Sequence, residues 1–156
     1  MKKLLLLLLV AIFAIPTMAQ SDHDYIEIER TVLKTERKAA VADAMQFTDE
    51  EAKVFWPLYN EYTAKVYEAK TKSLNIILDY ADSFETINDQ QADDLILRSF
   101  KVEQELQKLK MSYYKKFKKI LPAGRVARYY QIENKIEALI AAEIAFEIPL
   151  IEVGEK

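Results

Sequence analysis

The residue types that carry most protein chemistry are scarce in this chain, whose only histidine is His23. His23 lies between Asp22 and Asp24, and an imidazole flanked by carboxylates can supply metal ligands. One histidine is too few for a closed metal site. A copper or nickel site that uses the terminal amine needs histidine third in the chain, and cleavage before Gln20 would make His23 the fourth. We therefore expect no metal site and no cofactor.

Catalysis by serines or carboxylates has no visible framework in the sequence. Serines occur, but without a histidine base in the body of the chain: Ser21, Ser73, Ser83, Ser99 and Ser112. Two close acids would suffice for a carboxylate-only hydrolase, yet the acids lie in ordinary charged helix faces. No set of residues fills the roles of nucleophile, base and oxyanion donor, so we predict that the protein is not an enzyme.

A basic stretch at residues 108–132 is the strongest candidate for a binding surface. It holds eight basic residues and no acid, whereas residues 79–94 hold six acids and no base. One interpretation is structural, because acids favour the start of a helix and bases its end, and the bases would face Asp49, Glu50 and Glu51. The other is functional, because aromatic residues alternate with the charges: Tyr113, Tyr114, Phe117, Tyr129 and Tyr130.

As a surface, this stretch would hold flexible, partly unfolded protein chains, here called clients, or touch anionic lipid headgroups. Nucleic acid is not an expected partner, because the chain begins with an export signal. The predicted client surface consists of Lys110, Tyr113, Tyr114, Lys115, Lys116, Lys118, Lys119, Arg125, Arg128 and Tyr130.

The first nineteen residues have the order of a secretory signal peptide. Lys2 and Lys3 precede an apolar run at residues 4–15, and small residues follow before a cleavage point between Ala19 and Gln20. The run is shorter than the roughly 20 apolar residues that span a membrane. We predict cleavage there, a periplasmic or secreted protein, and no stable membrane insertion.

Composition then narrows the fold of residues 20–156, which we expect to form a single domain. Loss of Lys2 and Lys3 leaves 20 basic and 25 acidic residues, a net charge of −5. The absence of cysteine excludes disulfides, thiolate metal sites and a lipid-anchored amino terminus. Two glycines are too few for a glycine-rich phosphate loop. The abundance of Ala, Leu, Glu and Lys favours an all-α protein.

Apolar periodicity predicts an elongated antiparallel bundle or hairpin of about four helices. A first helix covers residues 25–45 behind a cap at Asp24. A second begins at a capping box formed by Thr48 and Glu51 and is kinked or divided at Pro57. Breaks at residues 83–88 and 121–124 bound a third helix of roughly 30 residues, which is capped by Asn88 and Gln91. Pro149 ends the fourth. So few helices leave an apolar stripe to cover, which favours a homodimer.

Two apolar features leave alternatives open. The aromatic stripe of the second helix favours core packing over a ligand pocket, although a carrier of a small apolar ligand stays open. Its members are Phe55, Tyr59, Tyr62, Tyr67 and Tyr80. The apolar tail at residues 146–153 either folds back over the bundle end or docks on one envelope protein, such as a sensor.

Helix starts in this chain resemble those of the Spy/CpxP-like periplasmic proteins, which repeat a Leu-Thr-x-x-Gln motif. The nearest match is the sequence Phe47-Thr48-Asp49-Glu50-Glu51, and a second, looser one begins at Leu121. Phe47 replaces the leucine and Glu51 the glutamine. The resemblance implies a small helical protein that forms a curved dimer and either binds unfolded proteins without ATP or modulates envelope-stress sensing.

Overall fold

The computed structural model describes residues 22–151, with the side chains of residues 22–26 and 28 left aside. Within that range there are four helices and no strand, which confirms the all-α prediction. The predicted signal peptide lies outside the described residues, as does the His23 side chain. None of the helices in the described range is long and apolar enough to cross a membrane. The helices are α2 (Asp22–Met45), α3 (Asp49–Ser83), α4 (Asp89–Ile120) and α5 (Ala123–Glu147).

The chain separates into two compact units, Met1–Ala39 and Ala40–Lys156, with the boundary inside α2. In the described part of the first unit, Arg30 pairs with Glu27 at 2.7 Å along the helix. Thr31 and Thr35 donate their hydroxyls to carbonyls one turn earlier. The prediction of a single domain stays a prediction, and the second unit carries all that follows.

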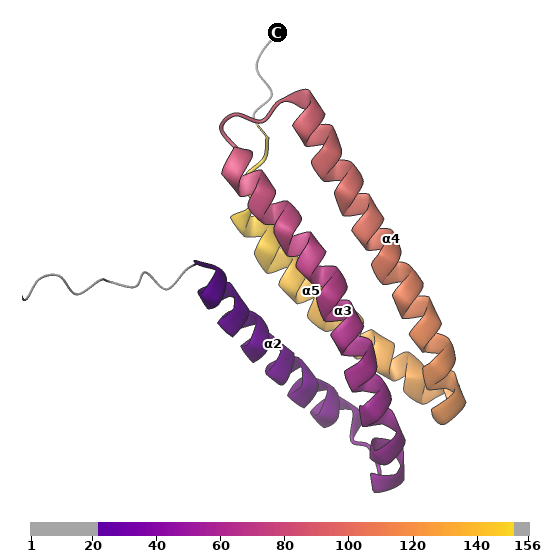
Figure 1. Cartoon of the computed structure of the whole chain (residues 1–156). Helices are drawn as coiled ribbons and strands as arrows, with labels where there is room; N and C mark the ends of the chain where they lie inside the picture. The colour runs from indigo at the N-terminus through magenta and orange to yellow at the C-terminus, as the bar shows by residue number, and fades with distance from the viewer. Residues whose placement is uncertain (1–21, 152–156) are drawn as a thin grey trace, which may run out of the picture. The chain divides into compact units, whose positions relative to one another are not determined.

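In the second unit, α3 and α4 are antiparallel neighbours joined by a short turn, and α5 returns beside them (Figure 1). Side chains fix the register of α5 against α3. Arg125 meets Glu51 near the start of both helices, Lys70 pairs with Glu137 midway, and the Tyr80 hydroxyl donates to the Pro149 carbonyl at the far end. The two helices therefore run in the same direction, as two short connections require.

Local capping explains where α3 and α4 begin. The Thr48 hydroxyl accepts from the Glu51 amide at 3.3 Å, and the Glu51 carboxylate accepts from the Thr48 amide at 3.2 Å. Asn88 and Gln91 make the same reciprocal pair, both at 3.0 Å. Both predicted capping boxes are confirmed. The predicted cap at Asp24 is wrong, because α2 already includes Asp22.

Pro57 lies inside α3, and the helix continues through it to Ser83. Division of the segment at Pro57 is therefore wrong, because one missing amide donor does not end a helix that later turns continue. The kink near Pro57 stays a prediction.

The corner between α4 and α5 is tighter than predicted. Leu121 ends α4 with extended backbone, and its amide donates to the Phe117 carbonyl at 3.0 Å. Pro122 is the N-cap of α5, so Gly124 already lies within the helix and the predicted break at residues 121–124 is too long. Proline has no amide hydrogen, and at the start of a helix this costs no hydrogen bond because the first amides have no partner within the helix.

The core lies where α2 meets α3 and where α4 meets α5. Phe55 is fully buried and contacts the Tyr59, Phe117 and Tyr129 rings at centroid distances of 5.1–5.6 Å. These stacked, tilted and edge-on contacts stabilise the fold beyond the burial of the rings alone. The core prediction holds for Tyr59 and Tyr62, which are buried, while Tyr67 and Tyr80 are half-buried. We call this cluster the aromatic core: Val41, Met45, Phe55, Tyr59, Tyr62, Tyr113, Phe117, Leu121, Val126 and Tyr129.

Candidate binding surface

Two arginines of the predicted client surface make hydrogen bonds to the end of α2 and the start of α3. Arg125 donates from Nε and Nη2 to the two carboxylate oxygens of Glu51, at 2.9 and 2.6 Å, and from Nη1 to the Met45 carbonyl at 2.9 Å. Arg128 donates twice to the Ala44 carbonyl, at 3.0 and 2.8 Å. The last carbonyls of α2 carry partial negative charge. Both guanidinium groups therefore close the end of that helix.

These contacts lower the pKa of the Glu51 carboxylate. Its hydrogen bond from Arg125 is the main cause that lowers the pKa below the ordinary 4.5, with a smaller contribution from the Thr48 amide. Phe47 lies beneath the same guanidinium, 5.2 Å from its carbon to the ring centroid. The motif-like residues Phe47, Thr48 and Glu51 thus meet in one structural cluster at the start of α3.

A second carboxylate, Glu61, binds two more residues of the predicted surface. It accepts from the Tyr113 hydroxyl at 2.5 Å and from Lys116 Nζ at 3.0 Å. These bonds lower the pKa of Glu61, while burial first and the Glu61 bond second raise the pKa of Tyr113. Tyr113 is only 2% exposed, so its ring belongs to the aromatic core and not to a surface.

Lys110 and Tyr130 are tied to each other and to α5. The Tyr130 hydroxyl donates to the Lys110 carbonyl at 3.2 Å, and Lys110 Nζ donates to Asn134 Oδ1 at 2.5 Å. Burial raises the pKa of Tyr130. These contacts join α4 to α5 and leave little of the Tyr130 ring for a partner.

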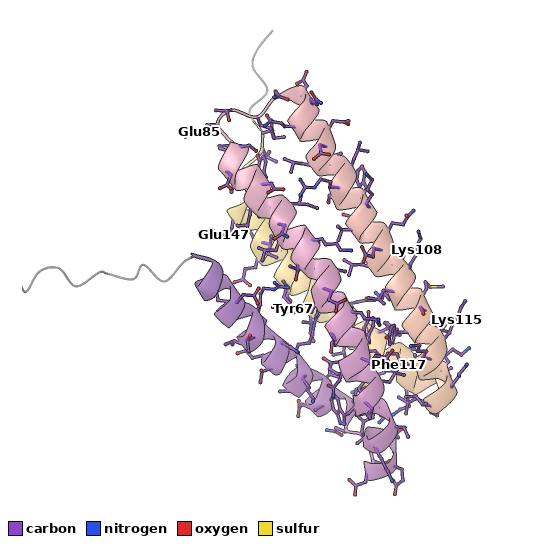
Figure 2. The ribbon with its side chains drawn as sticks, viewed as in Figure 1. Tyr67, Glu85, Lys108, Lys115, Phe117 and Glu147 are labelled. Carbon is purple, nitrogen blue, oxygen red and sulfur yellow. The ribbon has the colours of Figure 1, made fainter. Side chains whose placement is uncertain are left out.

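Five of the predicted residues are exposed: Arg128, which bonds to the Ala44 carbonyl, and four that gather on the outer side of α4. Tyr114, Lys115, Lys118 and Lys119 are exposed, and Lys118 Nζ lies 5.6 Å above the Tyr114 ring. Figure 2 shows Lys108 and Lys115 on this outer side and Phe117 on the side toward the other helices. The exposed Met111 lies one turn before Lys115 and escaped the sequence prediction. We call Met111, Tyr114, Lys115, Lys118 and Lys119 the α4 basic patch.

Apolar side chains continue along the outer side of α4 toward its start. Ile96 and Phe100 fit the apolar periodicity that predicts this helix, but Phe100 is 58% and Ile96 52% exposed. Leu97 is exposed beside them. The buried stripe of α4 instead follows Val102, Tyr113 and Phe117. Because α4 carries apolar residues on both its buried and its exposed face, the sequence pattern alone does not distinguish the two stripes.

The end of α5 exposes a second apolar group. Leu139 and Ile144 fit the apolar periodicity of α5 but are exposed. Phe146 and Leu150 are also exposed, each at 89%. The Tyr80 hydroxyl donates to the Pro149 carbonyl, and Ile148 beside it is half-buried.

Hollows on the described surface are open and charged. One of about 400 Å³ lies between α3 and α4, where Lys72 bridges to Glu105 at 2.7 Å. No group of three metal-ligating side chains occurs among the described residues. Among the described residues, the apolar and basic outer face of α4 is the surface best suited to contact another macromolecule.

Comparison with known proteins adds no relative. The chain matches no protein-family model, no curated protein and no solved structure. The resemblance to Spy/CpxP-like proteins therefore stays a prediction.

Proposed function

We propose that this protein is an exported binding protein of the bacterial envelope, which holds client proteins without ATP in the manner of a chaperone or an envelope-stress accessory protein. The observation that carries the proposal is the α4 basic patch, where an exposed Met111 and Tyr114 lie among three lysines. Among the described residues, Lys115, Lys118 and Lys119 have no ion-pair partner.

The patch has two properties that suit weak, general capture. Lysines attract acidic chains over about a Debye length of 8–10 Å. Methionine is flexible and fits varied apolar side chains, and tyrosine offers both a ring and a hydroxyl. The predicted signal peptide at residues 1–19 and the absence of cysteine support an envelope location. The resemblance of the helix starts to those of Spy/CpxP-like proteins supports the same role.

Suppression of client aggregation tests the proposal. A reduced or heated client is mixed with the protein and light scattering is followed. We expect suppression by the wild type and a clear loss in a patch variant that carries Lys115→Gln, Lys118→Gln and Lys119→Gln. A control with Lys53→Gln, Lys65→Gln and Lys135→Gln removes the same charge from exposed positions elsewhere. If both variants lose suppression of aggregation equally, the effect depends only on net charge, and the proposal of a specific surface is wrong.

Binding to vesicles of anionic lipid serves as the companion assay. If the patch variant loses vesicle binding while the wild type never protects a client, the lysines serve headgroups and the chaperone proposal is wrong.

A second candidate is a regulatory partner that docks on one envelope protein through its tail. Phe146 and Leu150 favour it, because these two nearly fully exposed apolar side chains lie four positions apart. Cross-linking in living cells should then yield one dominant partner that is lost in the Phe146→Ser, Leu150→Ser variant. Many unrelated partners that survive this change would favour the chaperone. The carrier of a small apolar ligand stays a prediction that native mass spectrometry tests.

A further inference from the structure

The outer side of α4 carries a regular stripe of exposed residues that runs far beyond the α4 basic patch. Eight positions follow one another at alternating spacings of four and three residues, the pattern of a helix face that packs lengthwise on another helix. The stripe lies opposite the side chains that α4 buries, Val102, Tyr113 and Phe117. We call it the α4 seam, and all its members are exposed: Asp93, Leu97, Phe100, Gln104, Gln107, Met111, Tyr114 and Lys118.

Charge changes sign from one end of the seam to the other. Asp89 and Asp93 lie at the start of α4, and Lys115 and Lys118 lie near its end. All four side chains are exposed, and none of them forms an ion pair among the described residues. Residues 93 and 118 are about 38 Å apart along the helix. The seam therefore offers negative charge at one end and positive charge at the other.

Apolar side chains lie between the charged ends in two layers. Leu97 and Phe100 form the first layer, Met111 and Tyr114 form the second, and two glutamines separate them. Phe100 is 58% and Met111 50% exposed. The layers are about 21 Å apart along α4. An amphipathic helix can contact both layers at once, because its own apolar residues recur at the same spacings of four and three.

We propose that the α4 seam selects amphipathic helices of client proteins and binds them antiparallel to α4. This inference rests on the proposed function, because it names the kind of client. Protein helices tend to begin with acidic residues and to end with basic ones, since these charges complement the helix dipole. Laid antiparallel on α4, such a helix brings its acidic start to Lys115 and Lys118 and its basic end to Asp89 and Asp93. The parallel direction would bring like charges together at both ends.

The two signs of charge distinguish this occupant from others. An anionic lipid surface or a uniformly acidic chain is attracted to Lys118 and repelled by Asp93, whereas a helix with an acidic start and a basic end is attracted by both. An extended chain repeats its side chains every two residues and does not match spacings of four and three. The seam therefore favours partly folded, helical clients, without requiring a particular sequence.

Binding of two designed peptides tests this selection. Each has about 26 residues, with leucines at alternating spacings of four and three. The first carries glutamates in its first turn and lysines in its last, and the second carries the same residues exchanged, so their net charge is equal. Fluorescence anisotropy is measured with the protein recovered after expression of the full sequence. We expect the first peptide to bind about tenfold more tightly at low salt, and Phe100→Glu to weaken both.

A protein variant separates charge matching from the lower helicity of the exchanged peptide. Asp93→Lys combined with Lys118→Asp cancels the charge at each end of the seam and should remove the preference. The control, Asp43→Lys combined with Lys53→Asp at exposed positions elsewhere, should keep it. Circular dichroism verifies that both variants keep their helices. A preference that survives in the seam variant would come from the peptide alone and overturn the proposal, as would equal binding of both peptides by the wild type.

Disulfide cross-linking shows the direction, because the chain has no cysteine of its own. A cysteine at the first residue of the first peptide should link to Lys119→Cys and not to Gln90→Cys, two exposed positions beside the ends of the seam. Linking to residue 90 would mean a parallel helix and overturn the proposal. So would light scattering that shows a second copy on the wild type that the peptide does not displace.

The peptide assay and the client assay can fail separately. A wild type that protects clients but does not discriminate between the peptides keeps the proposed function and loses the helix selection. Directional binding of the peptide without protection of any client keeps the helix site and contradicts the chaperone.

Discussion

The two ends of the second unit differ in the kind of side chain that holds them together. At the end that holds the aromatic core, Phe55, Phe117 and Tyr129 are fully buried. At the other end, residues 70–101 and 134–151 contain no fully buried side chain among those the structure describes. That end is held by half-buried aliphatic residues and by exposed ion pairs such as Arg98 with Asp79, at 2.5 Å.

The difference teaches how an amphipathic chain with few helices distributes its apolar residues. Aromatic rings fill the space at the end of the unit where α2 is followed by α3 and α4 is followed by α5. Away from that end, each helix has fewer neighbouring helices. Aliphatic side chains such as those of Leu97 and Leu139 therefore lie on the surface. We expect the aromatic end to dominate stability and the open end to supply contact surface.

The largest expected effect comes from truncating one residue at each end. Phe117→Ala should lower the free energy of unfolding by about 3–5 kcal/mol, because it empties a fully enclosed site. Ile77→Ala, at a half-buried position of the open end, should cost only about 1–2 kcal/mol. Urea denaturation followed by circular dichroism measures both. Equal losses would mean that the open end is packed as firmly as the aromatic end.

Two tyrosines at the aromatic end differ in whether their hydroxyl group has a hydrogen-bond partner. The Tyr113 hydroxyl donates to Glu61, whereas the buried Tyr129 hydroxyl has no hydrogen-bond partner among the described residues. Burial first, and then the Glu133 charge, raise the pKa of Tyr129. Tyr113→Phe should therefore cost about 1 kcal/mol, and Tyr129→Phe should be neutral or stabilise by up to about 1 kcal/mol.

The measurement is again the free energy of unfolding in urea. A loss in Tyr129→Phe as large as that in Tyr113→Phe would show that the Tyr129 hydroxyl is satisfied in solution.

Local signals made much of this fold predictable. Each capping box lies within four consecutive residues, so Thr48 with Glu51 and Asn88 with Gln91 mark helix starts without any tertiary information. The expectation that the basic stretch faces the acids at residues 49–51 also holds for Arg125 and Glu51. It followed from antiparallel connection alone.

The candidate surface was less predictable, for a physical reason. Periodicity reveals that a residue lies on an apolar stripe but not which stripe meets the core. Phe100 and Phe117 both fit such a stripe, and only the position of α3 decides that Phe117 is buried and Phe100 exposed. Likewise, Tyr113 and Tyr114 are adjacent in sequence yet lie in the core and on the surface respectively.

A single backbone angle at the turn between α2 and α3 offers a smaller effect. Gln46 has a φ of 45°, in the left-handed region that favours glycine after a helix. Gln46→Gly should raise the free energy of unfolding by about 0.5–1 kcal/mol. Gln131→Gly, the same change on an exposed face within α5, should lower it by about 1 kcal/mol. A loss in both variants would mean that the Gln46 side chain stabilises the turn.

The smallest expected effect is acid sensitivity, and it too belongs to the aromatic end. Arg125 lowers the pKa of Glu51 below the ordinary 4.5, and Tyr113 and then Lys116 lower that of Glu61. Ionised carboxylates thus stabilise the fold above pH 4.5, and this contribution is lost as the pH falls through the lowered folded-state pKa. Arg125→Gln removes the main cause of the Glu51 shift, so its stability should fall less steeply on acidification than that of the wild type.

Lys116→Gln should change the acid profile less than Arg125→Gln does, because Glu61 keeps its bond from the Tyr113 hydroxyl. Unfolding in urea at a series of pH values from about 6 to about 3 measures these slopes. An Arg125→Gln slope equal to that of the wild type would place the acid-sensitive groups elsewhere, and the ion pairs of the open end, Asp79 with Arg98 among them, would then be the next to remove.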